Sequence, residues 1–206
     1  MRRDSLPLLL TAGLVLVLMT GNAHANLVTN GNFGTGDLTG WTNAGNVDVL
    51  SDTELMAAYP SAINDTGIPY VADFGGGNGQ DDGTISQTFS TTAGTNYSLS
   101  FLYGAIGTGD GSEASNQSIQ LNLAGDLIPI TAVTTTNFAT LLNTYTYTFT
   151  ATGDSFTIGV TDESLSGNDA DGILANVDLE NIPEPTSLAL LGVSLLGLRL
   201  GRRKRS

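Results

Sequence analysis

Carboxylates are the only side chains that offer acid–base chemistry between Asn26 and Ile182. Only Asp4 and Glu184 of the chain's 20 acidic residues lie outside this stretch, which leaves 18 inside it, while all seven Lys and Arg residues lie outside. The stretch also has no Cys and no His. Serine hydrolysis with a His or Lys base, thiol nucleophiles, Schiff bases and His-rich zinc sites are therefore excluded. Nucleic acid is excluded as a partner, because no side chain there can neutralise phosphates.

The remaining chemistry of these acids is cation binding or carboxylate catalysis. Asp169 and Asp171 precede Gly172 as in part of a calcium loop, so calcium at this pair is an alternative to our expectation of no cofactor. For most individual acids, a solvated acidic surface is the favoured explanation. Glycoside hydrolysis needs two carboxylates ~5 to 9 Å apart, but we identify no pair in an apolar stretch that would raise one pKa. We therefore predict no enzymatic activity and no catalytic residue.

Aromatic side chains suggest a second kind of site, a platform on which pyranose rings stack. The candidates are Trp41, Tyr59, Tyr70 and Tyr103. For Trp41 and Tyr103 the hydrophobic core is the favoured location, since such residues belong to a core more often than to a binding platform.

The segments that must position these residues alternate between apolar and polar side chains, which is typical of half-buried strands. The alternation predicts strands at 70–74, 84–89, 97–103, 119–123, 145–149, 156–160 and 173–179. Their number and spacing favour an all-β fold, an antiparallel β-sandwich. One short helix is predicted after Ser51, because Ser51 and Glu54 form a capping-box pattern before an apolar run that Pro60 stops.

The first 25 residues have the pattern of a secretory signal peptide. Arg2 and Arg3 precede an apolar run at 6–19, and Ala23 and Ala25 frame a cleavage site. The secretion machinery and signal peptidase are thus expected partners, and the mature chain is expected to begin at Asn26.

The last 25 residues combine three unlike elements: a Pro183-Glu184-Pro185 break, an apolar run at 188–198, and a basic cluster of Arg202, Arg203, Lys204 and Arg205. Their order resembles the PEP-CTERM sorting tail of exported bacterial proteins. A helix over 186–201 would be about 24 Å long, which is marginal for a bilayer core of ~30 Å. Basic residues resist translocation, so the cluster is expected to stay cytoplasmic and leave the N-terminal domain outside. An uncut membrane anchor is the alternative.

Two segments of the middle region resemble the opening and closing strands of jelly-roll, galactose-binding-like domains related to carbohydrate-binding modules. They are 26–41, with Asn30-Gly31-Asn32-Phe33, and 172–179. The segment 85–101 resembles an internal hairpin of that group. The resemblance implies a calcium ion between the termini, but Gly34 and Ala175 stand where its carboxylates are expected.

These features predict three parts: a signal peptide at 1–25, an acidic sandwich domain at 26–181 and a sorting tail at 182–206. The tail's resemblance implies cleavage by an exosortase, and hence transient inner-membrane anchoring before delivery to the cell envelope, surface or extracellular matrix. We predict a non-enzymatic surface or matrix protein associated with exopolysaccharide or biofilm. The alternatives are a carbohydrate-binding protein and, more remotely, a carboxylate-dependent glycoside hydrolase.

Overall fold

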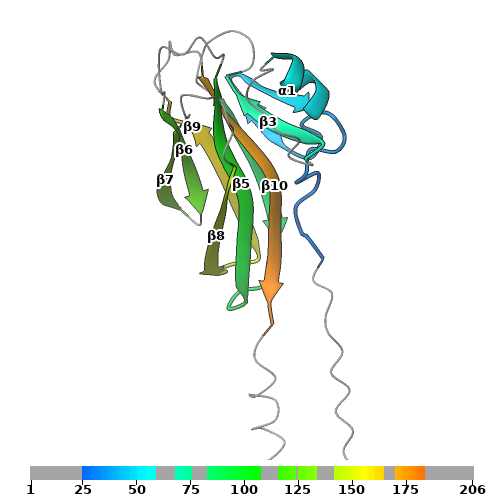
Figure 1. Cartoon of the computed structure of the whole chain (residues 1–206). Helices are drawn as coiled ribbons and strands as arrows, with labels where there is room; N and C mark the ends of the chain where they lie inside the picture. Colours follow the sequence, from blue (N-terminus) through cyan, green and yellow to red (C-terminus); the bar gives the residue numbers. More distant parts are fainter. Residues whose placement is uncertain are drawn as a thin grey trace, which may run out of the picture.

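The computed structural model describes residues 25–58, 68–75, 83–107, 116–123, 125–133, 142–164 and 170–183. Within these residues, ten strands form two five-stranded antiparallel sheets that pack face to face, so the predicted sandwich is confirmed (Figure 1). Sheet A has the order β1 (Thr42–Ala44), β4 (Thr84–Ser90), β9 (Ser155–Asp162), β6 (Asn116–Leu123), β7 (Asp126–Val133). Sheet B has the order β2 (Val47–Ser51), β3 (Tyr70–Phe74), β10 (Ala170–Ile182), β5 (Asn96–Gly107), β8 (Asn143–Thr150).

The core lies between the sheets, where each strand places every second side chain. Its fully buried members include Phe33, Phe74, Ile85, Leu99, Tyr103, Ile119, Leu121 and Leu174. All seven predicted strands are present, whereas β1, β2 and β7 were not predicted. β7 begins with an Asp and carries Pro129, and neither residue is typical of a strand interior.

A smaller apolar cluster covers the outer face of sheet B beside the single described helix, α1 (Asp52–Ala58). Leu55 of α1 packs there with Val71 of β3 and Ile173 of β10. The predicted capping box starts this helix: the Ser51 backbone N–H donates to Glu54 Oε2 at 2.8 Å, and the Glu54 N–H donates to Ser51 Oγ at 3.2 Å. These bonds satisfy donors that have no partner inside the first turn.

The hairpin expected over 85–101 is wrong, because β4 and β5 belong to different sheets. The connection at 91–95 crosses from sheet A to sheet B, and it bonds to the connection between β8 and β9, which crosses back. Gly94 N–H donates to Ala151 O at 2.8 Å, and Thr91 N–H donates to Asp154 O at 2.9 Å. Both strands have one apolar face, and two such strands can face each other across a core as well as pair within one sheet.

The opening strand expected over 26–41 is also wrong, because this segment consists of turns and the first strand begins at Thr42. Asn30 and Phe33 have φ of 53°, a left-handed conformation that interrupts a strand. Gln87 of β4 holds the turns by donating to the carbonyls of Thr29 and Gly40, both at 2.9 Å. The segment nevertheless runs beside β10, where Leu27 N–H donates to Leu179 O at 2.9 Å.

In the part of the chain that the structure describes, no helix has the length and apolar character needed to cross a bilayer. The predicted helix at 186–201 lies outside the described residues.

Candidate functional site

A β-bulge in β10 creates the most distinctive site on the outer face of sheet B. The register between β10 and β5 shifts between Ala175, which faces Leu102, and Asp178, which faces Ser100. One extra residue therefore sits on β10, and Asn176 takes a φ of 49° and is exposed. Asn accepts this left-handed conformation more readily than most residues, and bulges commonly redirect side chains at functional sites.

The N-terminal segment satisfies the backbone of the bulge. Val177 N–H donates to Gly31 O at 2.8 Å, and Asn26 Nδ2 donates to Val177 O at 3.1 Å. Asn26 Oδ1 accepts from Leu179 N–H at 3.0 Å, so this side chain clamps the start of the domain to its last strand. A Cβ on Gly31 would clash with the Val177 carbonyl oxygen, which explains why the close approach needs glycine.

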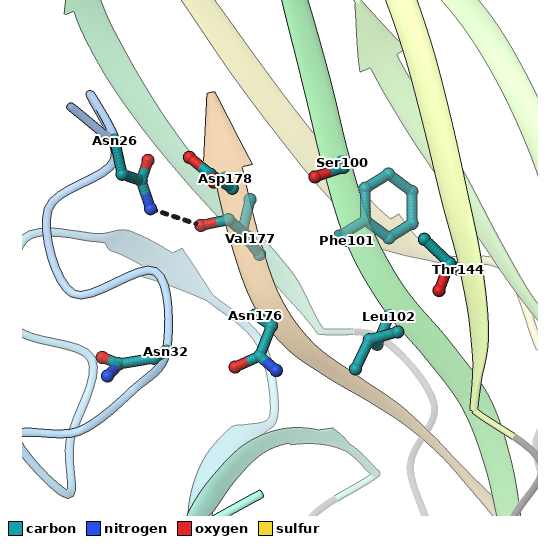
Figure 2. Close-up of a pocket in the computed structure, with 9 residues that line it drawn as sticks. All are labelled: Asn26, Asn32, Ser100, Phe101, Leu102, Thr144, Asn176, Val177 and Asp178. Atoms are coloured by element: carbon teal, nitrogen blue, oxygen red, sulfur yellow. Dashed lines mark hydrogen bonds between the residues drawn. The ribbon is translucent and has the colours of Figure 1, made fainter. Parts of the chain in front are cut away.

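A groove of about 420 Å³ runs beside this bulge. Figure 2 shows Asn26 and Asn32 of the N-terminal segment on one side, the bulge in the middle, and β5 with Thr144 of β8 on the other side. Its lining combines amides, hydroxyls and one carboxylate with a few apolar groups: Asn26, Asn32, Ser100, Phe101, Leu102, Thr144, Asn176, Val177 and Asp178.

The polar side chains that line the groove suit a ligand that is rich in hydroxyls. Asn176 is exposed at the bulge, and Asn32 uses its Oδ1 to accept from Gly34 N–H at 3.0 Å. Oδ1 of Asp178 is buried without a hydrogen-bond partner among the described residues. Burial raises the pKa of the Asp178 carboxyl, and Glu180 raises it further. An amide offers both donors and an acceptor and a carboxylate offers acceptors, the set that sugar hydroxyls require.

None of the described residues that line the groove presents an exposed aromatic face, so the stacking platform predicted from the sequence is not found among them. Phe101 is 2% exposed, and its ring packs in the core. Trp41 is 8% exposed and stacks on Phe33 at 5.8 Å, while Tyr103 is fully buried. A stacking role is wrong for Trp41 and Tyr103, because core packing leaves no ring face for a sugar. Tyr70 is half-buried near Gly36.

A buried carboxyl was missed at the sequence level. Asp73 of β3 is 2% exposed, and its Oδ1 has no hydrogen-bond partner among the described residues. Burial, and then the charges of Asp171, Asp48 and Asp162, raise the pKa of Asp73 to about 8. The signal was present in the apolar run that contains it, Val71-Ala72-Asp73-Phe74. The burial that raises this pKa also closes Asp73 to a substrate.

The predicted calcium pair is only partly described. Asp171 is half-buried, with its Oδ1 directly over Gly75, and Asp169 lies outside the described residues. Asp162, the last residue of β9, accepts a hydrogen bond on its Oδ1 from Ser164 Oγ at 2.6 Å. No group of three or more acids or histidines in the described ranges is placed to hold a metal ion. Calcium at Asp169 and Asp171 therefore stays a prediction.

Most residues of the predicted processing signals lie outside the described ranges. These are Ala23, Glu184, Pro185, Arg202, Arg203, Lys204 and Arg205, and the stacking candidate Tyr59 is also outside. Ala25 and Pro183 are described, and both are exposed at the ends of the described chain. Pro183 follows directly after β10, whose last residue, Ile182, pairs with Asn96 of β5.

Two family models match the sequence and together span most of it. Residues 21–180 match the family described as a protein of unknown function, DUF642. This chain belongs to that family. Residues 181–205 match the PEP-CTERM protein-sorting motif, so the resemblance of the tail is confirmed. The motif indicates an exported, envelope-associated protein and implies exosortase processing. No curated protein matches the sequence.

Solved structures with a similar arrangement of strands have low sequence identity to this DUF642 protein. TmCBM61 in complex with beta-1,4-galactotriose is 16% identical, with a TM-score of 0.49, and covers 77% of this chain and 99% of its own. A family 16 carbohydrate binding module-2 is 17% identical, with a TM-score of 0.45 and coverages of 75% and 99%. A cyclase from Fischerella sp. TAU is 17% identical, with a TM-score of 0.48 and coverages of 80% and 100%. Similarity at this level transfers neither ligand nor activity.

Proposed function

We propose that this protein is a non-enzymatic component of the bacterial cell surface or extracellular matrix, released from the membrane by cleavage in its Pro183–Pro185 segment. The observation that carries the proposal is the direct junction between the sandwich and the sorting motif. β10 is the middle strand of sheet B, and its pairing with β5 runs to Ile182. The match to the sorting motif begins at residue 181, and its Pro183-Glu184-Pro185 segment starts at the first residue after the strand. Cleavage there removes no residue of the sheet, so the domain stays folded after release.

The geometry of the two chain ends supports this route. The N-terminal segment and the end of β10 lie side by side, joined by the Leu27–Leu179 bond, and both point toward the same end of the sandwich (Figure 1). A signal sequence and a C-terminal tail can therefore both reach one membrane while the domain stays on one side of it.

Replacing Glu184 tests the processing step. Glu184→Ala should leave export intact and abolish removal of the tail, which is measured as retention of a C-terminal epitope on the exported chain. Glu180→Gln, an acid four residues earlier, is the matched control and should be processed normally. Normal processing of Glu184→Ala would contradict the proposal.

A second function, carbohydrate binding, is favoured by the groove beside the bulge. Its amides, hydroxyls and carboxylate match the alternating donors and acceptors of a sugar. The 18 acidic residues and the absence of cations between Asn26 and Ile182 disfavour an acidic glycan, because like charges repel. We therefore assign a neutral polysaccharide to the groove, bound by hydrogen bonds rather than by stacking.

Binding of neutral and acidic polysaccharides to the protein tests this assignment. Asn176→Gly removes the amide but accepts the left-handed φ of this position, and it should weaken binding of a neutral glycan about two- to twelvefold, since one hydrogen bond contributes about 0.5 to 1.5 kcal/mol. Asn43→Gly on β1, which removes another exposed amide, is the matched control and should have no effect. The assignment fails if no neutral glycan binds, or if both variants bind equally well.

A further inference from the structure

The outer strands of the two sheets differ in how well they are protected from pairing with another chain. β1 has only three residues, β7 carries Asp126 and Pro129, and β2 carries Asp48 and leads directly into α1. Short length, charge and proline are the usual protections of an edge strand. β8 has none of them: it is eight residues long and reads Asn-Thr-Tyr-Thr-Tyr-Thr-Phe-Thr.

The outer side of β8 is open to pairing with a further strand. It pairs with β5 on one side, and no described strand pairs with its other side. Its threonines are exposed on the outer face, whereas Tyr145, Tyr147 and Phe149 are half-buried on the inner face. Phe101 of β5 stacks on Tyr145 at 5.6 Å and on Tyr147 at 6.2 Å. The aromatic row of β5 and β8 therefore ends at an open edge.

The charge distribution indicates what covers this edge. β5 and β8 contain no Asp or Glu, although the chain has 18 such residues and no cation between Asn26 and Ile182. Two copies of this acidic domain repel each other in most relative orientations, and the repulsion is smallest when the uncharged strands face each other. A basic partner would instead be drawn to the acidic surfaces. The occupant with the matching chemistry is a second copy of the chain.

We propose that β8 pairs with β8 of a second copy in an antiparallel two-fold arrangement centred on Tyr147. Directly opposite residues must share a face, so the inner residues can only meet inner residues. Centring on Tyr147 places Tyr145 opposite Phe149, Tyr147 opposite itself and Thr146 opposite Thr148. Every aromatic residue then meets an aromatic one and every threonine meets a threonine, the pairs that stabilise sheets.

The size of this contact makes the association weak in dilute solution. One strand pair buries much less than the ~800 Å² per partner of a typical stable complex. Copies confined to the cell surface meet at a high local concentration, so pairing occurs there. The intact cell is therefore the place to test it.

Single cysteines test the register, because the chain has no native cysteine. The full-length protein is co-expressed as Thr146→Cys and Thr148→Cys copies with different tags, and intact cells are oxidised. Opposite residues in an antiparallel pair have Cα atoms about 4.5 to 5.5 Å apart, within disulfide range. We expect a disulfide-linked dimer that carries both tags, and its yield should be at least several-fold higher than the yield of dimer from either variant expressed alone. Thr131→Cys on β7, an exposed threonine of another edge strand, is the control.

Two results would overturn the proposal. One is cross-linking no stronger than that of Thr131→Cys. The other is a Thr146→Cys variant whose thiol resists maleimide labelling without cross-linking, because a glycan or another protein would then cover the edge. A second variant separates pairing from folding: Thr146→Glu should lower photo-cross-linking between copies several-fold, whereas Thr131→Glu should not. Equal yields from these two folded variants would also refute the proposal.

Discussion

Replacing Asp73 with Asn should remove most of the stability loss that this carboxyl causes as pH rises. Asp73 lies on the face of β3 that carries Val71, opposite Ile173 of β10 and Asp48 of β2. At 2% exposure the carboxyl is costly to ionise, and the nearby acids add repulsion, so its pKa rises to about 8. At neutral pH the folded protein therefore holds a proton that the unfolded chain releases.

The sign and the size follow from this difference. The pKa in the folded state is above the ordinary value of 3.8, so the folded state binds more protons and is stabilised fully below about pH 4. Stability then falls as pH rises, by about 1.4 kcal/mol per pH unit, until pH passes about 8. Over this pH range the loss of unfolding free energy adds up to about 6 kcal/mol. This figure is an upper limit on the contribution of Asp73, because the whole stability of a domain is about 5 to 15 kcal/mol.

Denaturant unfolding at pH 5, 7 and 9 measures this effect. Asp73→Asn should be more stable than the wild type by about 1 to 2 kcal/mol at pH 5 and by several kcal/mol at pH 9, because the neutral amide has no proton to lose. Asp126→Asn on the exposed start of β7 removes one charge without this burial and is the control. If the free-energy difference between Asp73→Asn and the wild type is the same at all three pH values, Asp73 does not titrate from a buried neutral state and the reasoning is refuted.

Three further predictions concern the site and the elements that hold it. Gly31→Ala should destabilise the domain by about 1 to 3 kcal/mol, because the new Cβ clashes with the Val177 carbonyl. Gly153→Ala is the control and should not destabilise it, since its Cβ meets only one atom at 4.0 Å. Equal thermal midpoints for the two variants would contradict the close approach at Gly31. Ser51→Ala should cost about 0.5 to 2 kcal/mol by removing the cap of α1, measured by chemical denaturation against Thr53→Ala; a change no larger than that control would argue against the cap. As pH is lowered, protonation of Asp178 should remove an acceptor and weaken glycan binding. Because burial raises the pKa of this carboxyl, the loss should begin at a higher pH than for an ordinary aspartate. Titration calorimetry of Asp178→Asn should show no such pH dependence.

Local patterns predicted much of this fold. The alternation of apolar and polar residues located seven strands, and the pairing of Ser51 with Glu54 located the helix start. Both signals depend on residues close together in the sequence, so they can be read without knowing the fold. The sorting motif was found for the same reason, since it is a short segment with a fixed order of elements.

The candidate site could not be predicted in this way. The groove joins Asn32, Ser100 and Asn176, which are far apart in the sequence, and it depends on a bulge that shifts the register by one residue. The aromatic candidates show the same difficulty, because an apolar side chain such as Trp41 can face either a core or a ligand. Only the packing of the two sheets decides which one it meets.

The sequence by itself determined that the protein is exported, that its domain is a β-sandwich, and that the stretch between Asn26 and Ile182 has no His, Cys, Lys or Arg. Each of these conclusions follows from composition or from short local patterns. The tertiary structure decided that β4 and β5 belong to different sheets, that Asp73 is buried, and that β8 is an uncharged edge strand with no described neighbour on its outer side. These features depend on which strands become neighbours, and that choice is made by the free energy of packing the whole domain, not by any single segment.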